Sequence, residues 1–206
     1  MTRSALIDAV RVRIDEVSSG GNALVDVGVE ENNPTDTIID GLLDEAALEV
    51  LQTAPALRLP VADGKTATVT ADESDAVTGE IALPANFLRM VCLQMDDWKR
   101  PLYHIEPEGS LIASRQKNVY LRGSASKPVA VLEKRPSGYV LCYFSTNSAV
   151  HTIKRLDYVP ALAAENVTGQ QNIDALCWVC AAKVLTITQD ANAAATAMEH
   201  ARSLLK

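Results

Sequence analysis

Residues 83–102 read LPANFLRMVCLQMDDWKRPL and stand at the centre of a chain whose two ends have the pattern of helices. Leu88–Met95 is largely apolar on both faces, which predicts a strand that lies centrally in its module and is covered on each side. Asp96 and Asp97 predict a turn, and Trp98–Ile105 is the predicted hairpin partner of that strand. Two prolines fall at a strand start and on an edge, where a missing N–H costs least. The stretch therefore predicts architecture and no chemical site.

Further strands are predicted around this hairpin by short runs that alternate in polarity or are rich in β-branched residues, with turn residues between them. They cover Lys65–Thr70, Gly79–Leu83, Asn118–Arg122, Pro128–Lys134, Tyr139–Ser145 and His151–Tyr158. A short helix is predicted to start at Pro107–Ser110 and to reach Ala113, and a turn is predicted at Pro136–Gly138. This succession of short strands predicts a β-rich module.

Helical periodicity marks the N-terminal part of the chain. Thr2 is the predicted cap of a first helix, whose apolar residues recur at helical spacing until Ser18–Asn22 ends it. Ala23–Val29 predicts a strand or a structured loop, and Asn32–Pro34 predicts a turn. A second helix with a broad apolar stripe follows.

The second helix is predicted from its cap Thr35 to Thr53. Near the C-terminus, a helix is predicted from Gln170, and Asp190 caps a last, alanine-rich helix. The order of elements predicts an α+β fold. Residues 1–58 and 159–206 form a helical bundle from the two ends of the chain, and residues 59–158 form an antiparallel β-rich insertion.

The bulk composition narrows the functional classes. The chain has 206 residues and a net charge of −7, which argues against a large basic surface for gripping nucleic acid. It leaves room for a protein that DNA slides past. No long apolar run opens the chain, so neither a signal peptide nor a membrane helix is expected. The four cysteines all lie in apolar runs, which favours reduced, buried thiols in a reducing compartment.

Two patterns that contain cysteine have features of a chemical site. Cys177-Trp-Val-Cys180 has the spacing of a redox or zinc pair, but both cysteines fall inside an apolar helix, which favours core packing. His104-Ile-Glu106 ahead of this pair is similar to the zinc deaminase pattern, without its proline and with the histidine on a predicted strand. His151 and His200 stand alone. The sequence therefore predicts no catalytic residue, no cofactor and no metal, and hence no enzyme.

The order of elements and several local stretches resemble the head–tail connector proteins of tailed bacteriophages, also called adaptor, ring or neck proteins. The resemblance covers most of the chain, and its local motifs are degenerate. The stretches are Leu83–Arg89, Trp98–Leu102, Pro107–Ser110, Asn118–Gly123, Lys127–Ala130 and Leu141–Tyr143. One departure is that the C-terminus lacks the long flexible tail with which some adaptors reach into the portal.

The resemblance implies a structural protein of the virion. Such subunits form a ring below the portal protein, commonly of twelve copies, which extends the DNA channel and receives tail or further neck proteins. Genomic double-stranded DNA passes through without sequence-specific binding and no membrane is involved. The protein would be assembled in the host cytoplasm and reside in the virion neck. Ring closure requires a heterologous interface, in which one face of a subunit meets a different face of its neighbour.

Two groups of residues are candidates within this interpretation. Acids of the second helix are expected to face the channel, where they would repel phosphate: Asp36, Asp40, Asp44, Glu45 and Glu49. Partner contacts are expected at the hairpin and at the C-terminal helix: Trp98, Lys99, Arg100, Tyr103, Leu204, Leu205 and Lys206. Alternatively, Trp98 and Tyr103 merely pack the β-rich module.

Two other functions stay open at this point. One is a small cytosolic enzyme with redox or zinc chemistry at Cys177 and Cys180. The other is a binding module that forms no ring.

Overall fold

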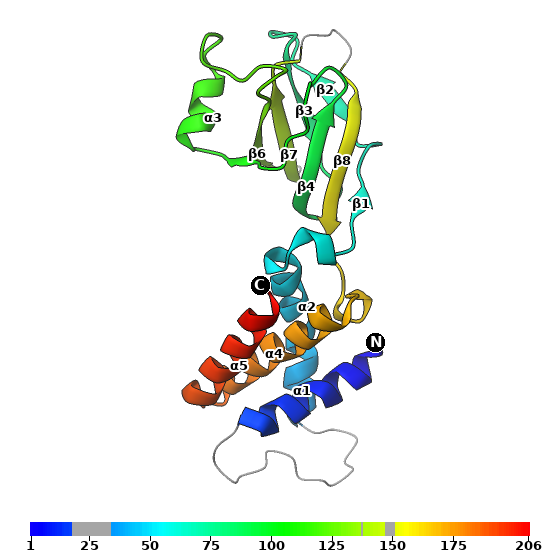
Figure 1. The fold of residues 1–206 in the computed structure, drawn as a ribbon, viewed down its shortest axis with the longest axis vertical. Coiled ribbons are helices and arrows are strands. Elements are labelled where there is room, and N and C mark those ends of the chain that lie inside the picture. The colour runs from blue at the N-terminus through cyan, green and yellow to red at the C-terminus, as the bar shows by residue number, and fades with distance from the viewer. Residues whose placement is uncertain (18–33, 137, 147–150) are drawn as a thin grey trace. The chain divides into compact units, whose positions relative to one another are not determined.

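The computed structural model describes residues 1–17, 34–136, 138–146 and 151–206. Some predicted features lie wholly or partly outside these residues: the helix end at Ser18–Asn22, the strand or loop at Ala23–Val29, and the turns at Asn32–Pro34 and Pro136–Gly138. The chain divides into two compact units, Met1–Pro60 together with Ala161–Lys206, and Val61–Pro160. The predicted α+β class is confirmed, because helices from both ends of the chain pack together and the sheets are inserted between them in sequence (Figure 1).

The helical unit is built around one buried helix. Its helices are α1 (Arg3–Val17), α2 (Pro34–Thr53), α4 (Gln170–Ile187) and α5 (Ala191–Leu204), with short 3-10 helices η1 (Ala56–Arg58) and η2 (Ala164–Asn166). α4 packs against α1, α2 and α5. α5 turns Ala193, Ala194, Ala197 and Ala201 inward, and these small side chains let it approach α4 closely. No described helix is long and apolar enough to cross a membrane.

Local capping sets the helix ends. Thr2 Oγ1 accepts a hydrogen bond from the Ala5 amide at 3.3 Å, and Asp190 Oδ1 accepts one from the Ala193 amide at 3.1 Å, so both predicted caps are confirmed. α2 begins at Pro34, one residue before the predicted cap Thr35. A proline suits the first helical position, because its fixed φ is helical and its missing N–H would have no partner there.

The β-rich unit contains two sheets. The first is three-stranded in the order β1 (Ala62–Asp63), β8 (Ile153–Pro160), β4 (Phe87–Met95). The second is five-stranded in the order β2 (Val69–Ala71), β3 (Thr78–Ala82), β7 (Gly138–Phe144), β6 (Val129–Arg135), β5 (Glu106–Pro107). All pairs are antiparallel except β5 with β6. A short helix, α3 (Leu111–Gln116), lies at the margin of the unit (Figure 1).

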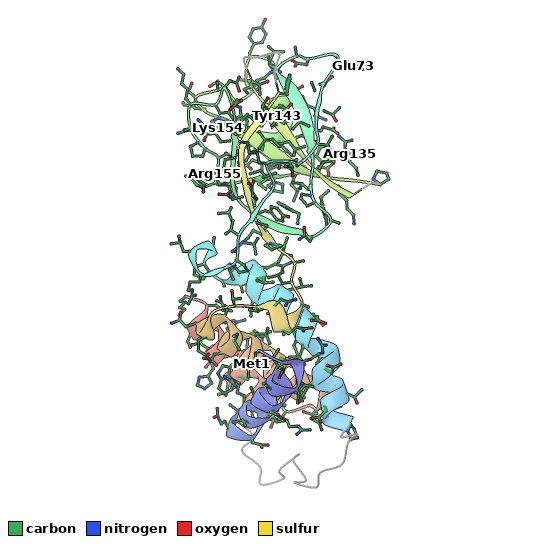
Figure 2. The ribbon with its side chains drawn as sticks, turned by 90° about the vertical axis from the view of Figure 1, so that its right-hand side faces the viewer. Met1, Glu73, Arg135, Tyr143, Lys154 and Arg155 are labelled. Carbon is green, nitrogen blue, oxygen red and sulfur yellow. The ribbon has the colours of Figure 1, made fainter. Side chains whose placement is uncertain are left out.

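The core of the β-rich unit draws on both sheets. Leu93 and Leu156 come from the three-stranded sheet, and Ile81, Leu141 and Tyr143 come from the five-stranded one, all fully buried. Tyr143 lies inside the unit, whereas the charged end of Arg135 lies at its surface (Figure 2). The alternating inward residues of the strands therefore hold the two sheets together.

The predicted hairpin forms only in part. Asp96 and Asp97 make the predicted turn and the chain returns antiparallel to β4, but the two segments pair as strands only at an isolated bridge between Leu93 and Leu102. The strand that pairs with β4 along its length is β8, with Leu93 opposite Leu156. Pro101 has no N–H to donate to a ladder, and the Lys99 amide donates instead to the Ala125 carbonyl at 2.9 Å. In this sheet β4 is at the end and β8 is central. Cys92 and Leu93, which point to opposite faces of β4, are both fully buried, so the prediction that this strand is covered on each side is confirmed.

Two other predicted strands also need correction. Residues 118–122 form turns, because the Asn118 carbonyl accepts from the Leu121 and Arg122 amides, and its side chain accepts from the Tyr120 amide at 3.0 Å. The strand predicted at 65–70 is confined to β2, which starts at Val69. The remaining predicted strands match β3, β6, β7 and β8 to within two residues at each end.

Candidate functional site

The cysteine pair on α4 is part of the helical core. Cys177 and Cys180 are fully buried, and the Cys180 thiol donates to the Ile39 carbonyl at 3.8 Å. Burial raises the pKa of Cys177 to about 11 and that of Cys180 to about 12. Both are therefore neutral thiols at neutral pH, which is the opposite of an activated redox or metal-binding pair.

The histidines have structural contacts. His104 lies in the β-rich unit in the irregular segment before β5, with Nε2 3.7 Å from Glu106 Oε1, so its predicted strand is wrong. His151 Nδ1 is hydrogen-bonded to the Tyr143 hydroxyl at 2.5 Å, and His200 stacks on Trp178. Within the described residues, no group of three or more His, Cys, Asp or Glu could hold a metal ion.

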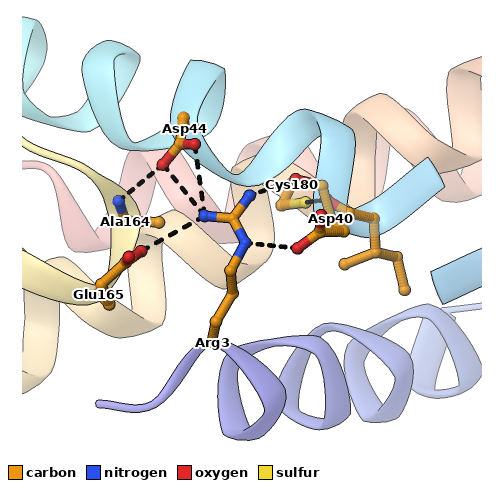
Figure 3. A network of polar contacts seen from close by, with 7 residues as sticks. Arg3, Asp40, Asp44, Ala164, Glu165 and Cys180 are labelled. Carbon is orange, nitrogen blue, oxygen red and sulfur yellow. Dashed lines mark hydrogen bonds and ion pairs between the residues drawn. The ribbon is translucent and has the colours of Figure 1, made fainter. Parts of the chain in front are cut away.

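The five acids of α2 are paired with cations of the neighbouring helices. Figure 3 shows Arg3 of α1 beside Asp40, Asp44 and Glu165, with its guanidinium donating to the Asp40 carbonyl at 2.7 Å. Asp44 also accepts from the Ala164 amide at 2.9 Å. The side-chain hydrogen bond to Asp40 raises the pKa of Arg3, which keeps it charged at any ordinary pH.

Two further cations complete this pairing. Arg11 of α1 binds Asp36, and Lys183 of α4 lies 2.8 Å from Glu45 and 3.1 Å from Glu49. Three cations thus stand against the five carboxylates that were predicted to face a DNA channel. These acids connect α2 to α1 and α4 through ion pairs. Because the cations neutralise part of their charge, the negative field that they present is reduced. Their place on a channel wall stays a prediction.

The residues predicted at partner contacts are differently placed. Trp98 is 2% exposed and packs in the core of the β-rich unit, so it is not available as an exposed anchor. The alternative that Trp98 packs the β-rich module is therefore confirmed, and its prediction as an exposed partner contact is wrong. Lys99, Arg100 and Tyr103 are exposed.

At the C-terminus, Leu204 and Leu205 are half-buried and Lys206 is exposed. The Leu204 carbonyl accepts a hydrogen bond from Arg58 Nη1 at 3.0 Å. The end of α5 is thereby fixed to η1, so this part of the candidate surface belongs to a held helix end.

Sequence reasoning missed the most exposed apolar stretch, which comprises α3 and the turns after it. We call residues 111–121 the α3 segment. Five of its side chains are exposed, with fractions of 67, 42, 67, 95 and 59%: Leu111, Ile112, Val119, Tyr120 and Leu121. Three of them lie in the strand predicted at Asn118–Arg122, in which alternate residues would be buried. The signal was Asn118, which favours a turn over a strand.

Polar contacts hold both ends of the α3 segment. Ser110 caps α3 by accepting from the Ala113 amide at 3.0 Å. Gln116, which is 4% exposed, accepts from the Gly123 amide at 2.8 Å, and Arg122 Nη1 lies 2.5 Å from Asp75 Oδ2. The backbone is therefore fixed while the apolar side chains face solvent, which is typical of a preformed contact surface.

Two grooves lie in the described surface. One, of about 640 Å³, is bounded by α3 and by β3, β6 and β7, and holds Arg135 at 2.8 Å from Glu80 and 2.7 Å from Glu133. Cys142 also lines it. Burial, and then Glu133 and Glu80, raise the pKa of this thiol to about 12, so Cys142 is no nucleophile either.

The second groove lies between α4 and α5 and has a volume of about 370 Å³. We call it the α4–α5 groove. Its lining is largely small and apolar: Ala182, Lys183, Thr186, Gln189, Ala191, Ala194, Ala195 and Met198. Alanines on both helices leave a shallow apolar depression where larger side chains would have filled it.

Comparison with known proteins gives no further assignment: no family model matches the chain, and no curated protein matches it.

Proposed function

We propose that this chain is a structural virion protein, the subunit of a head–tail connector ring that lies below the portal, extends the DNA channel and docks the tail. The observation that carries the proposal is the architecture, a helical unit made from both ends of the chain with a β-rich unit inserted between them. The order of elements in this architecture agrees with the resemblance to the connector family.

The surfaces of the chain support a role in assembly. A ring subunit needs two dissimilar contact faces, and the chain has a fixed apolar projection, the α3 segment, and an apolar depression, the α4–α5 groove. A net charge of −7 suits a protein past which DNA moves without sticking. We expect twelve copies, in contact with portal protein above and tail or further neck proteins below.

The cysteine enzyme is the weaker alternative. A redox or zinc site requires thiolates that are accessible, whereas burial keeps Cys177 and Cys180 protonated in the core. A binding module without a ring would share the exposed surfaces, so assembly is what distinguishes it from a connector.

Negative-stain electron microscopy and mass photometry of the full chain, alone and mixed with the portal protein of the same phage, test the proposal. We expect ring particles, formed by the free protein or on the portal. A chain that stays monomeric at all concentrations and also fails to join the portal would contradict the connector function. A Cys177→Ala/Cys180→Ala variant should assemble as the unsubstituted chain does.

A further inference from the structure

The α3 segment projects apolar side chains, and the α4–α5 groove is a largely apolar depression. The segment presents apolar side chains on a backbone that Ser110, Gln116 and Arg122 hold in place. The groove offers a depression in which four of the eight lining residues are alanines. Tyr120, at 95% exposure, is the most exposed large side chain of the segment, and a rigid aromatic residue is a frequent anchor in protein interfaces.

The charges around the two surfaces are also complementary. The segment carries Arg115 and Lys117, both exposed and neither with an ion-pair partner among the described residues. Beside the groove, Glu45 and Glu49 outnumber Lys183, and Glu199 adjoins the lining residue Met198. Opposite charges at the rim of an apolar contact favour encounter in one orientation and disfavour like faces.

We propose that the α3 segment of one copy docks into the α4–α5 groove of a second copy. The contact is heterologous, because the two surfaces come from different parts of the chain, and it is the kind of contact from which a ring closes. The inference rests on the proposed connector function and adds which surfaces join neighbouring subunits.

Site-directed cross-linking tests the contact. Tyr120→Cys places a thiol on the segment, and Ala195→Cys places one in the groove, where residue 195 is exposed. The four native cysteines are buried, so a bismaleimide reacts with the introduced thiols first. We expect covalent dimers when the two single variants are mixed, and none above background when either is treated alone. The double variant should give a ladder of covalent multimers.

A matched pair controls for random collision. Tyr139→Cys places the thiol at an exposed position of β7, outside the α3 segment. Its mixture with Ala195→Cys should therefore give little dimer. Equal yields from the two mixtures would overturn the inference. So would cross-linking of Tyr120→Cys with itself, or a double variant that is linked only within its own chain.

Microscopy of the unsubstituted chain separates this inference from the proposed function. Rings without the mixed dimer overturn the α3 contact and leave the connector function standing. Mixed dimers without rings support the contact and contradict ring closure. Without either, both proposals fail. Tyr120→Ala should weaken association by about 30-fold or more, as expected for an interface anchor, whereas Tyr139→Ala should change it by less than about 2-fold.

Discussion

The acids of α2 in the helical unit and the apolar side chains of the α3 segment in the β-rich unit differ in whether they have partners. In the helical unit, all five acids of α2 have cationic partners on α1 or α4, including the Arg3 network that reaches Glu165. In the β-rich unit, polar groups such as Gln116 are buried as anchors, while apolar side chains of the α3 segment face solvent. The acids of α2 are thus paired within the helical unit, whereas the α3 segment presents apolar surface that a partner would cover.

The two units also differ in the packing that stabilises them. The ion pairs of α2 are partly exposed, so each contributes little to stability, and apolar packing around α4 carries the helical unit. The β-rich unit depends on a core shared by two sheets, into which Trp98 is inserted from an irregular segment. Three substitutions examine this difference, from the largest expected effect to the smallest.

Trp98→Ala should have the largest effect, because it opens a cavity in the core of the β-rich unit. We expect the free energy of unfolding of that unit to fall by about 3–5 kcal/mol. Hydrogen exchange measured on peptides from residues 61–160 localises the loss. Tyr103→Ala, an exposed neighbour, should change it by less than about 0.5 kcal/mol. A Trp98→Ala variant of unchanged stability that failed to bind a partner would contradict the core role of Trp98 and support its prediction as a partner contact.

The buried thiols of α4 should make the helical unit sensitive to alkali. In an unfolded chain a cysteine ionises near pH 9, whereas folding raises the pKa of Cys177 to about 11 and that of Cys180 to about 12. The folded state therefore holds these protons more tightly. The free energy of unfolding is unaffected below about pH 8 and falls as the pH rises towards 11, by roughly 2–3 kcal/mol per thiol.

Comparing variants isolates this effect from other groups that titrate in alkali. Urea unfolding between pH 7 and 11 is followed by circular dichroism at 222 nm, to which the four long helices of the helical unit contribute most. The free energy of unfolding should decline less steeply with pH for Cys177→Ala/Cys180→Ala than for the unsubstituted chain. Cys142→Ala, in the β-rich unit, is the control and should leave this signal unchanged. Parallel curves for all three proteins would mean that the α4 thiols ionise without unfolding the helical unit.

The helices could be predicted from the sequence because their determinants are local. Thr2 and Asp190 bond to amides three residues away, and the apolar periodicity lies within each helix. Strand partners are set at long range, so the pattern that gave β4 its bounds gave no means of choosing β8 over the adjacent segment. For the same reason, the sequence left open whether Trp98 is exposed or buried, since its burial depends on residues from distant strands.

The candidate surfaces were harder to predict than the fold. The acids of α2 were correctly placed on its polar side, but their partners lie far along the chain, as with Arg3 and Asp40. The α3 segment was missed because its exposure follows from a turn at Asn118 and from the buried anchor Gln116. Without those contacts, apolar residues among polar ones favour the prediction of a short strand.

Arg3→Ala should have the smallest of the three effects. It removes one cation from the Asp40, Asp44 and Glu165 cluster, and also the bond to the Asp40 carbonyl, so like charges of α2 and η2 are left together. We expect a loss of about 1 kcal/mol in the free energy of unfolding of the helical unit at low salt. Because salt screens the repulsion among the remaining acids, the loss should shrink in about 1 M salt.

Arg135→Ala is the matched control for Arg3→Ala. Arg135, at the end of β6, pairs with Glu133 of the same strand and with Glu80 of β3, and the Arg135 and Glu80 side chains are each 46% exposed. Its removal should lower the free energy of unfolding by less than the removal of Arg3 does, because solvent screens an exposed ion pair. Urea titrations of both variants at low and high salt decide the matter. An equal, salt-independent loss for the two would mean that the pairing of α2 is no more than a surface feature, and the contrast between the units would then rest on the α3 segment alone.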